Sequence, residues 1–125
     1  MTHAAVMYAR DLDRLVEFYT AHGLTVDEAR PGDYAVLTGP HCELSIIQIP
    51  RHIAAHIEIQ SPPQARENTP IKLVFVVSSI DEVLGGTGAL GGRIKDGSKR
   101  WHFRGRAVQD AIDPEGNVYQ LREPL

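Results

Sequence analysis

The sequence predicts an α+β fold in which one domain, residues 1–125, is made of two βαβββ modules. Three observations predict this fold: the order of elements occurs twice, each copy has a helix with an acidic start and a glycine after it, and the chain ends in a β-hairpin. We expect module 1 at about 1–49, a linker at about 50–70 and module 2 at about 71–125. A chain of this length buries about two-thirds of the surface that it exposes when unfolded, so folding should need no metal or disulfide.

The first module begins with a strand at residues 3–9 and a helix at residues 10–23. Asp11 is placed to cap the start of this helix, and Gly23 to end it. The apolar residues of the helix recur at spacings of three and four: Leu12, Leu15, Val16 and Tyr19. Three strands should follow in hairpin succession: 24–30, 34–40 and 42–50.

The second module repeats this order after a helical turn at residues 53–57 and a proline-rich linker. Its expected elements are a strand at 71–77, a glycine-interrupted helix at 79–92 and strands at 93–95, 106–113 and 117–123. An offset of 68 residues aligns five pairs: Val6 with Val74, Asp13 with Asp81, Leu15 with Val83, Gly23 with Gly91, and Val26 with Ile94. The matched glycines and aspartates favour a duplicated fold.

Composition and charge limit the possible functions of the protein and its cellular compartment. The net charge of −3 argues against a nucleic-acid partner. A local basic run is either a solvated loop or an anion-binding segment: Lys95, Lys99, Arg100, Arg104 and Arg106. Cys42 is the only cysteine, which excludes an intramolecular disulfide and suggests a buried thiol in a reducing compartment. No stretch is apolar enough to span a membrane and the start lacks signal-peptide features, so we expect a cytoplasmic protein without a membrane partner.

The C-terminal hairpin contains one polar side chain in an unusual place. Residues 113–117, "DPEGN", form a dense turn signal between two strands. In the second strand, Gln120 lies between Tyr119 and Leu121 and should therefore point to the opposite face from both. We therefore expect the Gln120 side chain either to have a function or to have a hydrogen-bonding partner.

Three motifs in this order resemble those of the vicinal oxygen chelate superfamily, which includes glyoxalases, bleomycin-resistance proteins and extradiol dioxygenases. They are "RDLDRLVEFYTAHGL" after the first strand, "FVVSSIDEVL" after the fifth and "DPEGNVYQL" at the end. The resemblance covers nearly the whole chain. It implies that the two βαβββ modules form a curled mixed sheet around a central cleft, which holds either a divalent metal or a small ligand.

The resemblance also implies four positions for metal ligands, usually two His and two Glu. The family's spacing places them here at Ala4, Glu43, Leu73 and Gln120. Only Glu43 is a good ligand, so we expect no metal cofactor. His3 is one residue out of register and should face away. The alternative is that a β-bulge brings His3 to Glu43, and that the two hold a divalent metal such as Ni, Zn, Fe or Mn.

The predicted ligand-binding residues are a small set of polar and aromatic side chains: Glu43, Trp101, Arg104, Asp110 and Gln120. Glu43 and Gln120 either bind a polar ligand group or hydrogen-bond each other or water. Trp101 and Arg104, in "WHFRGR", could form a platform for a planar or anionic ligand, or Trp101 could plug the sheet while Arg104 is solvated. Asp110 is either a general base or an exposed strand residue.

Two functions follow from this sequence. The first is a small-molecule binding protein with a metal-free cleft. The alternative is a lyase, isomerase or dioxygenase-type enzyme that uses a divalent metal or a carboxylate general base, Asp110 or Glu43. Members of the superfamily often form two-fold dimers, and the first strand of each module needs a neighbour, so we expect a homodimer.

Overall fold

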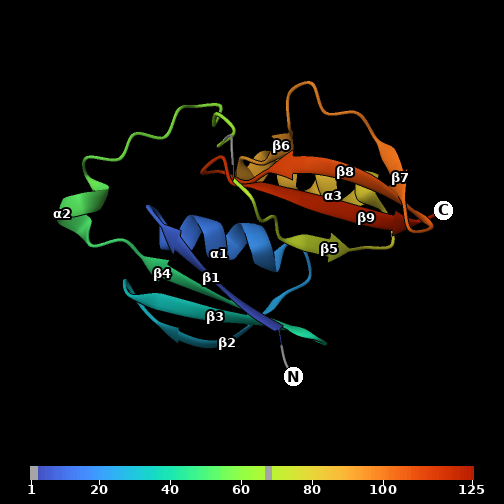
Figure 1. The fold of residues 1–125 in the computed structure, drawn as a ribbon. Helices are drawn as coiled ribbons and strands as arrows, with labels where there is room; N and C mark the ends of the chain where they lie inside the picture. Colours follow the sequence, from blue (N-terminus) through green and yellow to red (C-terminus); the bar gives the residue numbers. More distant parts are fainter. Residues whose placement is uncertain (1–2, 67–68) are drawn as a thin grey trace. The chain divides into compact units, whose positions relative to one another are not determined.

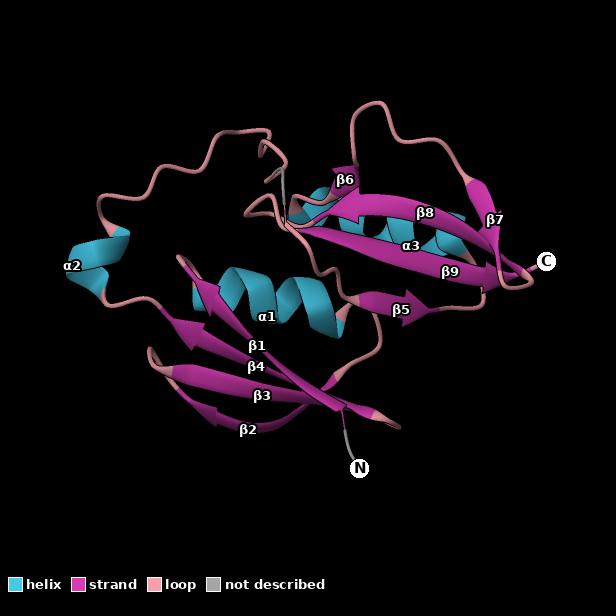
Figure 2. Cartoon of the chain, viewed as in Figure 1, coloured by secondary structure: helices cyan, strands magenta, loops and turns pink. Residues whose placement is uncertain are grey.

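The computed structural model describes residues 3–66 and 69–125 and confirms the predicted α+β class. The chain divides into two compact units, Met1–Glu58 and Ile59–Leu125. Each unit contains a mixed, open β-sheet, with four strands in the first and five in the second. In both units a strand, a helix and then further strands follow one another, as predicted (Figures 1 and 2).

The first unit contains β1 (His3–Ala9), α1 (Leu12–Thr20), β2 (Thr25–Arg30), β3 (Tyr34–Gly39), β4 (Cys42–Gln48) and a short α2 (Arg51–Ala54). Its strand order is β1-β4-β3-β2, in which only β1 and β4 are parallel. Helix α1 packs against one face of this sheet (Figure 1), and its buried side chains are Leu12, Leu15, Phe18 and Tyr19. We call the opposite face of each sheet its open face.

The second unit contains β5 (Val74–Val76), α3 (Ile80–Thr87), a 3-10 turn η1 (Gly88–Leu90), β6 (Arg93–Ile94), β7 (Trp101–Phe103), β8 (Arg106–Ile112) and β9 (Val118–Pro124). Its strand order is β5-β9-β8-β6, and β7 also pairs with β8. Tyr119 and Leu121 are buried on the side of the sheet that α3 covers, as expected. Burial and the nearby Asp113 carboxylate raise the pKa of Tyr119, so its hydroxyl stays neutral.

The two units repeat each other in detail. In both, the first strand runs parallel to the last strand, and the remaining ladders are antiparallel. Asp11 and Ser79 cap their helices by accepting hydrogen bonds from the backbone N–H three residues later. Gly23 and Gly91 have φ angles of 106° and 97°, which a residue with a side chain rarely adopts. The internal repeat predicted from the sequence is therefore confirmed.

Two local predictions are wrong. The sequence assigned no strand to the start of "WHFRGR", but Trp101–Phe103 is a strand, joined to β8 by a two-residue turn in which Arg104 and Gly105 have φ angles of 50° and 74°. Cys42 is exposed rather than buried, because it begins β4 beside the exposed turn residues Pro40 and His41. The helical turn expected at 53–57 is present: α2 covers Arg51–Ala54, and the backbone N–H groups of His56 and Ile57 donate to the carbonyl oxygens of Ile53 and Ala54.

The "DPEGN" turn has a structural role. The Asp113 carboxylate accepts hydrogen bonds from the backbone N–H groups of Glu115 and Asn117 and from the side-chain amide of Asn117. Gly116 has a φ of 84°, and a Cβ there would clash with the backbone oxygen of Gln64. The turn is thus closed by Asp113 and fits closely against the preceding linker.

Candidate functional site

Gln120 lies in a row of side chains across the open face of the second sheet. Its Cα partners are Val74 on β5 and Asp110 on β8. Cross-strand partners point to the same face of a sheet, so Gln120 and Asp110 are neighbours on the open face. The amide that stands between two apolar residues in the sequence therefore lies beside a carboxylate.

A second row lies one step along the same face. Arg122 is paired with Val76 on β5 and with Val108 on β8. Trp101 on β7 is the next partner of Val108, so its side chain points to the same face as Arg122. The open face thus combines a polar centre with an aromatic side chain at one margin.

Lys72 joins this polar centre from the segment that precedes β5. Its ammonium Nζ lies 2.9 Å from Oδ2 of Asp110 and donates a hydrogen bond to it. The Asp110 side chain is only 12% exposed, whereas that of Lys72 is 34% exposed. The lysine therefore covers and neutralises a largely buried carboxylate.

Arg122 is held from two sides. Its Nη2 donates a hydrogen bond of 3.0 Å to Oε1 of Gln120, and its guanidinium carbon lies 5.0 Å from the centre of the Phe103 ring. The ring gives a cation–π contact that keeps the guanidinium against the sheet. Gln120 thus positions an arginine rather than standing alone.

Two atoms of this group are buried without a hydrogen-bond partner among the residues that the structure describes: Oδ1 of Asp110 and Nε of Arg122. One is an acceptor and the other is a donor. We refer to Lys72, Asp110, Gln120 and Arg122 as the polar cluster. It is the candidate site of the second unit.

The predicted site residues of this unit are only partly brought together. Trp101, Asp110 and Gln120 share the open face, but Arg104 occupies the exposed tip of the β7–β8 turn. Sequence reasoning missed Lys72 and Arg122. The alternation after Gln120 could have found Arg122, since residues two apart on a strand share a face.

The position predicted at Leu73 is wrong by one residue. Ala4 stands seven residues before the N-cap Asp11, and the residue seven before the N-cap Ser79 is Lys72. Strand alternation also assigns Leu73 to the face of Phe75, whose ring packs against the buried Tyr119. Lys72 therefore occupies the position where the resemblance implies a metal ligand.

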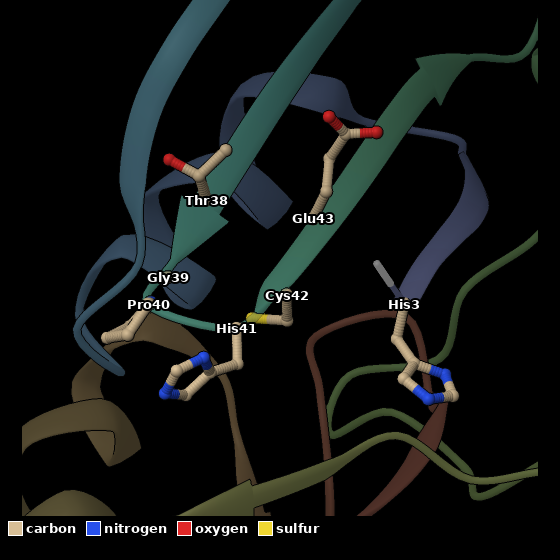
Figure 3. A pocket seen from close by; sticks show the side chains of 7 residues that line it. All are labelled: His3, Thr38, Gly39, Pro40, His41, Cys42 and Glu43. Carbon is tan, nitrogen blue, oxygen red and sulfur yellow. The ribbon is translucent and has the colours of Figure 1, made fainter. Parts of the chain in front are cut away.

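Glu43 lies in the first unit, on the open face of its sheet. The β1–β4 register is uninterrupted, with Ala4 opposite Glu43 and His3 opposite Cys42. His3 and Glu43 both line a cavity of about 410 Å³ at this end of the sheet. Figure 3 shows the Glu43 carboxylate on one side of the strands, beside Thr38, and the His3 ring on the other.

The residues present do not fit a divalent metal. The four implied positions hold Ala4, Glu43, Lys72 and Gln120, which offer one carboxylate, one weak amide and an ammonium that cannot coordinate. The continuous register leaves no bulge to turn His3 towards Glu43. Among residues 3–66 and 69–125, no three His, Cys, Asp or Glu side chains are grouped as a metal site.

The sequence matches no protein-family model and no curated protein. Solved structures do resemble the chain. A glyoxalase/bleomycin resistance protein/dioxygenase family enzyme from Burkholderia phytofirmans PsJN has a TM-score of 0.71 at 17% identity, covering 98% of this chain and 97% of that one. Lactoylglutathione lyase from Agrobacterium tumefaciens has a TM-score of 0.61 at 21% identity, covering 98% and 92%. A bleomycin-binding protein in complex with bleomycin has a TM-score of 0.59 at 15% identity, covering 100% and 98%.

These likenesses define the class of protein by its fold. The chain has the two-module βαβββ fold of the glyoxalase, bleomycin-resistance and dioxygenase proteins, which confirms the resemblance in fold. At these identities the likeness concerns the fold alone, and the chemistry must be argued from the side chains. In the part of the chain that the structure describes, no helix is long and apolar enough to cross a membrane.

Proposed function

We propose that this protein binds a small organic molecule without a metal, and that the open face of its second sheet is the binding surface. The observation that carries the proposal is the Lys72–Asp110 ion pair. In a metal-dependent member, the position of Lys72 would supply a ligand to a cation. Here it supplies a cation of its own, which repels a divalent ion and attracts the acidic groups of a ligand.

The composition of the surface agrees with a ligand site. Ligand pockets combine apolar and aromatic side chains with a few placed polar groups. On this face the polar cluster lies between Trp101 of β7 and the exposed Val74 and Val76 of β5. The bleomycin-binding neighbour is a precedent for small-molecule binding on this fold.

The enzyme alternative has less support. A general base needs a carboxylate that is free to take a proton and that lies in a site closed to water. Oδ2 of Asp110 is already engaged by the Lys72 ammonium, and Glu43 lies on an exposed strand end. We therefore give binding rather than catalysis as the proposed function.

The test exploits the fact that the chain has one tryptophan. Trp101 fluorescence would be followed during titration with a fragment library of anions, cations and neutral compounds, once with EDTA and once with added Ni²⁺ or Zn²⁺. We expect compounds that bind equally well in both conditions. Binding that occurs only with the metal would overturn the proposal, and so would a stoichiometric metal in protein purified without chelator.

A further inference from the structure

The polar cluster carries an unmatched pair of atoms that indicates what its ligand contributes. Oδ1 of Asp110 lacks a donor, and Nε of Arg122 lacks an acceptor, among the described residues. A buried polar atom without a partner destabilises the folded state. A ligand with both a donor and an acceptor would form a hydrogen bond with each of these two atoms.

The charge of the cluster indicates the sign of the ligand. Lys72 and Arg122 are cations and Asp110 is an anion, so the three together keep one positive charge. Arginine presents a planar fork that suits a carboxylate, and the contacts to Gln120 and Phe103 hold that fork in place. An organic monoanion balances this charge.

The side chains beside the cluster indicate the apolar part of the ligand. Trp101 and Phe103 lie on the open face beside the cluster and are 37% and 48% exposed. Neighbouring strands are about 4.8 Å apart, so Trp101 on β7 and Arg122 on β9, two strands away, are separated by about 10 Å. This distance suits a molecule with an aromatic ring at one end and a carboxylate at the other.

We propose that the ligand is a small aromatic carboxylate that carries a hydrogen-bond donor near its carboxylate; this inference rests on the proposed function. The carboxylate binds the Arg122 guanidinium through Nε, the donor binds Oδ1 of Asp110, and the ring packs on Trp101. Both atoms are covered in the free protein. The one-third-exposed Lys72 moves aside on binding, and its ammonium then pairs with the carboxylate of the ligand.

The test uses N-acetylphenylalanine, which has all three features, and three probes that lack one each. 3-Phenylpropionate lacks the amide donor, N-acetylphenylalanine amide lacks the charge, and N-acetylalanine lacks the ring. Trp101 fluorescence would report each titration in the presence of EDTA. We expect N-acetylphenylalanine to bind at least about fivefold more tightly than each probe, the ratio that one hydrogen bond typically gives.

Arg122→Gln should weaken the binding of N-acetylphenylalanine by about tenfold or more, whereas Arg14→Gln, the same charge change on the exposed side of α1, should leave it unchanged. Equal affinity for all four probes, no response to any of them, or no effect of Arg122→Gln would overturn this inference. The proposed function would survive those results if other library compounds still bind in EDTA. It fails together with the inference only if nothing binds without metal.

Discussion

The ammonium of Lys72 lies 2.9 Å from the Asp110 carboxylate. This contact joins the segment before β5 to β8, which lies two strands away from β5 in the sheet. The two residues are 38 positions apart in sequence. The pair holds an ammonium group on the open face, where it neutralises a carboxylate that water hardly reaches. Stability and ligand choice in the second unit should therefore both depend on it.

The first prediction concerns the stability of this pair. Lys72→Met should destabilise the protein by about 1 to 3 kcal/mol, because it leaves the buried Asp110 charge without its partner. Adding Asp110→Leu should restore most of the loss, since replacing both charges by apolar groups removes the desolvation cost. Urea unfolding of both single variants and the double variant measures the coupling.

Lys99→Met serves as the matched control, because Lys99 is exposed. It should change the free energy of unfolding by no more than about 0.5 kcal/mol. If the effects of Lys72→Met and Asp110→Leu simply add, the ion pair does not stabilise the fold.

The second prediction concerns Gln48 at the end of β4. Its buried amide makes four hydrogen bonds: it accepts from the Leu12 N–H and donates to the backbone oxygens of Ala9, Arg10 and Ile49. Gln48→Met keeps the size but leaves these groups unpaired, so we expect a loss of about 2 to 4 kcal/mol in the free energy of unfolding. Gln60→Met, at an exposed position, should have almost no effect in the same chemical denaturation experiment.

The third prediction compares two glycines of the second unit. Gly116→Ala should destabilise the protein by more than about 2 kcal/mol, because its φ is 84° and the new Cβ would meet the Gln64 oxygen. Gly85 lies in α3 with open space around its Cβ position, so Gly85→Ala should instead stabilise the helix by about 0.5 to 1 kcal/mol. The Tm should fall in the Gly116 variant and rise in the Gly85 variant. A loss of stability in both variants would contradict the open space assigned to the Gly85 position.

Local signals were enough to predict most of the fold. The cap Asp11 and the glycines Gly23 and Gly91 act within one helical turn, so their roles can be recognised in the sequence. β7 was missed because its hairpin turn begins with Arg104, a residue that rarely adopts a positive φ. Only the second of the two turn residues is therefore a glycine or asparagine, the residues that usually mark such a turn in a sequence.

The site was harder to predict than the fold because it depends on register between strands. Gln120 could be assigned to the open face by alternation alone. Its neighbours Lys72 and Asp110 come from other parts of the chain, and a shift of one residue exchanges Lys72 for Leu73. Such a shift decides whether the position holds an ammonium or an apolar side chain.

The fourth prediction concerns assembly. β1 and β5 are edge strands, and their open-face residues Tyr8 and Val76 are exposed. Edge strands with apolar side chains favour pairing with another chain, so we expect a homodimer in sedimentation velocity experiments. Tyr8→Glu should weaken it by at least about tenfold, because burying a charge costs more than the 1.4 kcal/mol that this factor represents. A wild-type monomer at every concentration would rule out the dimer.

The last prediction tests the register of the candidate site by building a metal site there. Lys72 reaches Asp110, and Asp110 is the cross-strand partner of Gln120, so the three side chains converge on one face. Lys72→His with Gln120→Glu would therefore place an imidazole and a new carboxylate beside the native Asp110 carboxylate. These three ligands suit Zn²⁺ or Ni²⁺, so we expect stoichiometric binding by calorimetry and a rise in Tm on metal addition.

Leu73→His with Gln120→Glu is the matched control, because Leu73 belongs to the other face and should give no tight site. Should the Leu73 variant bind the metal as well as the Lys72 variant, or the Lys72 variant fold without binding it, the assignment of Lys72 to the ligand position would be wrong.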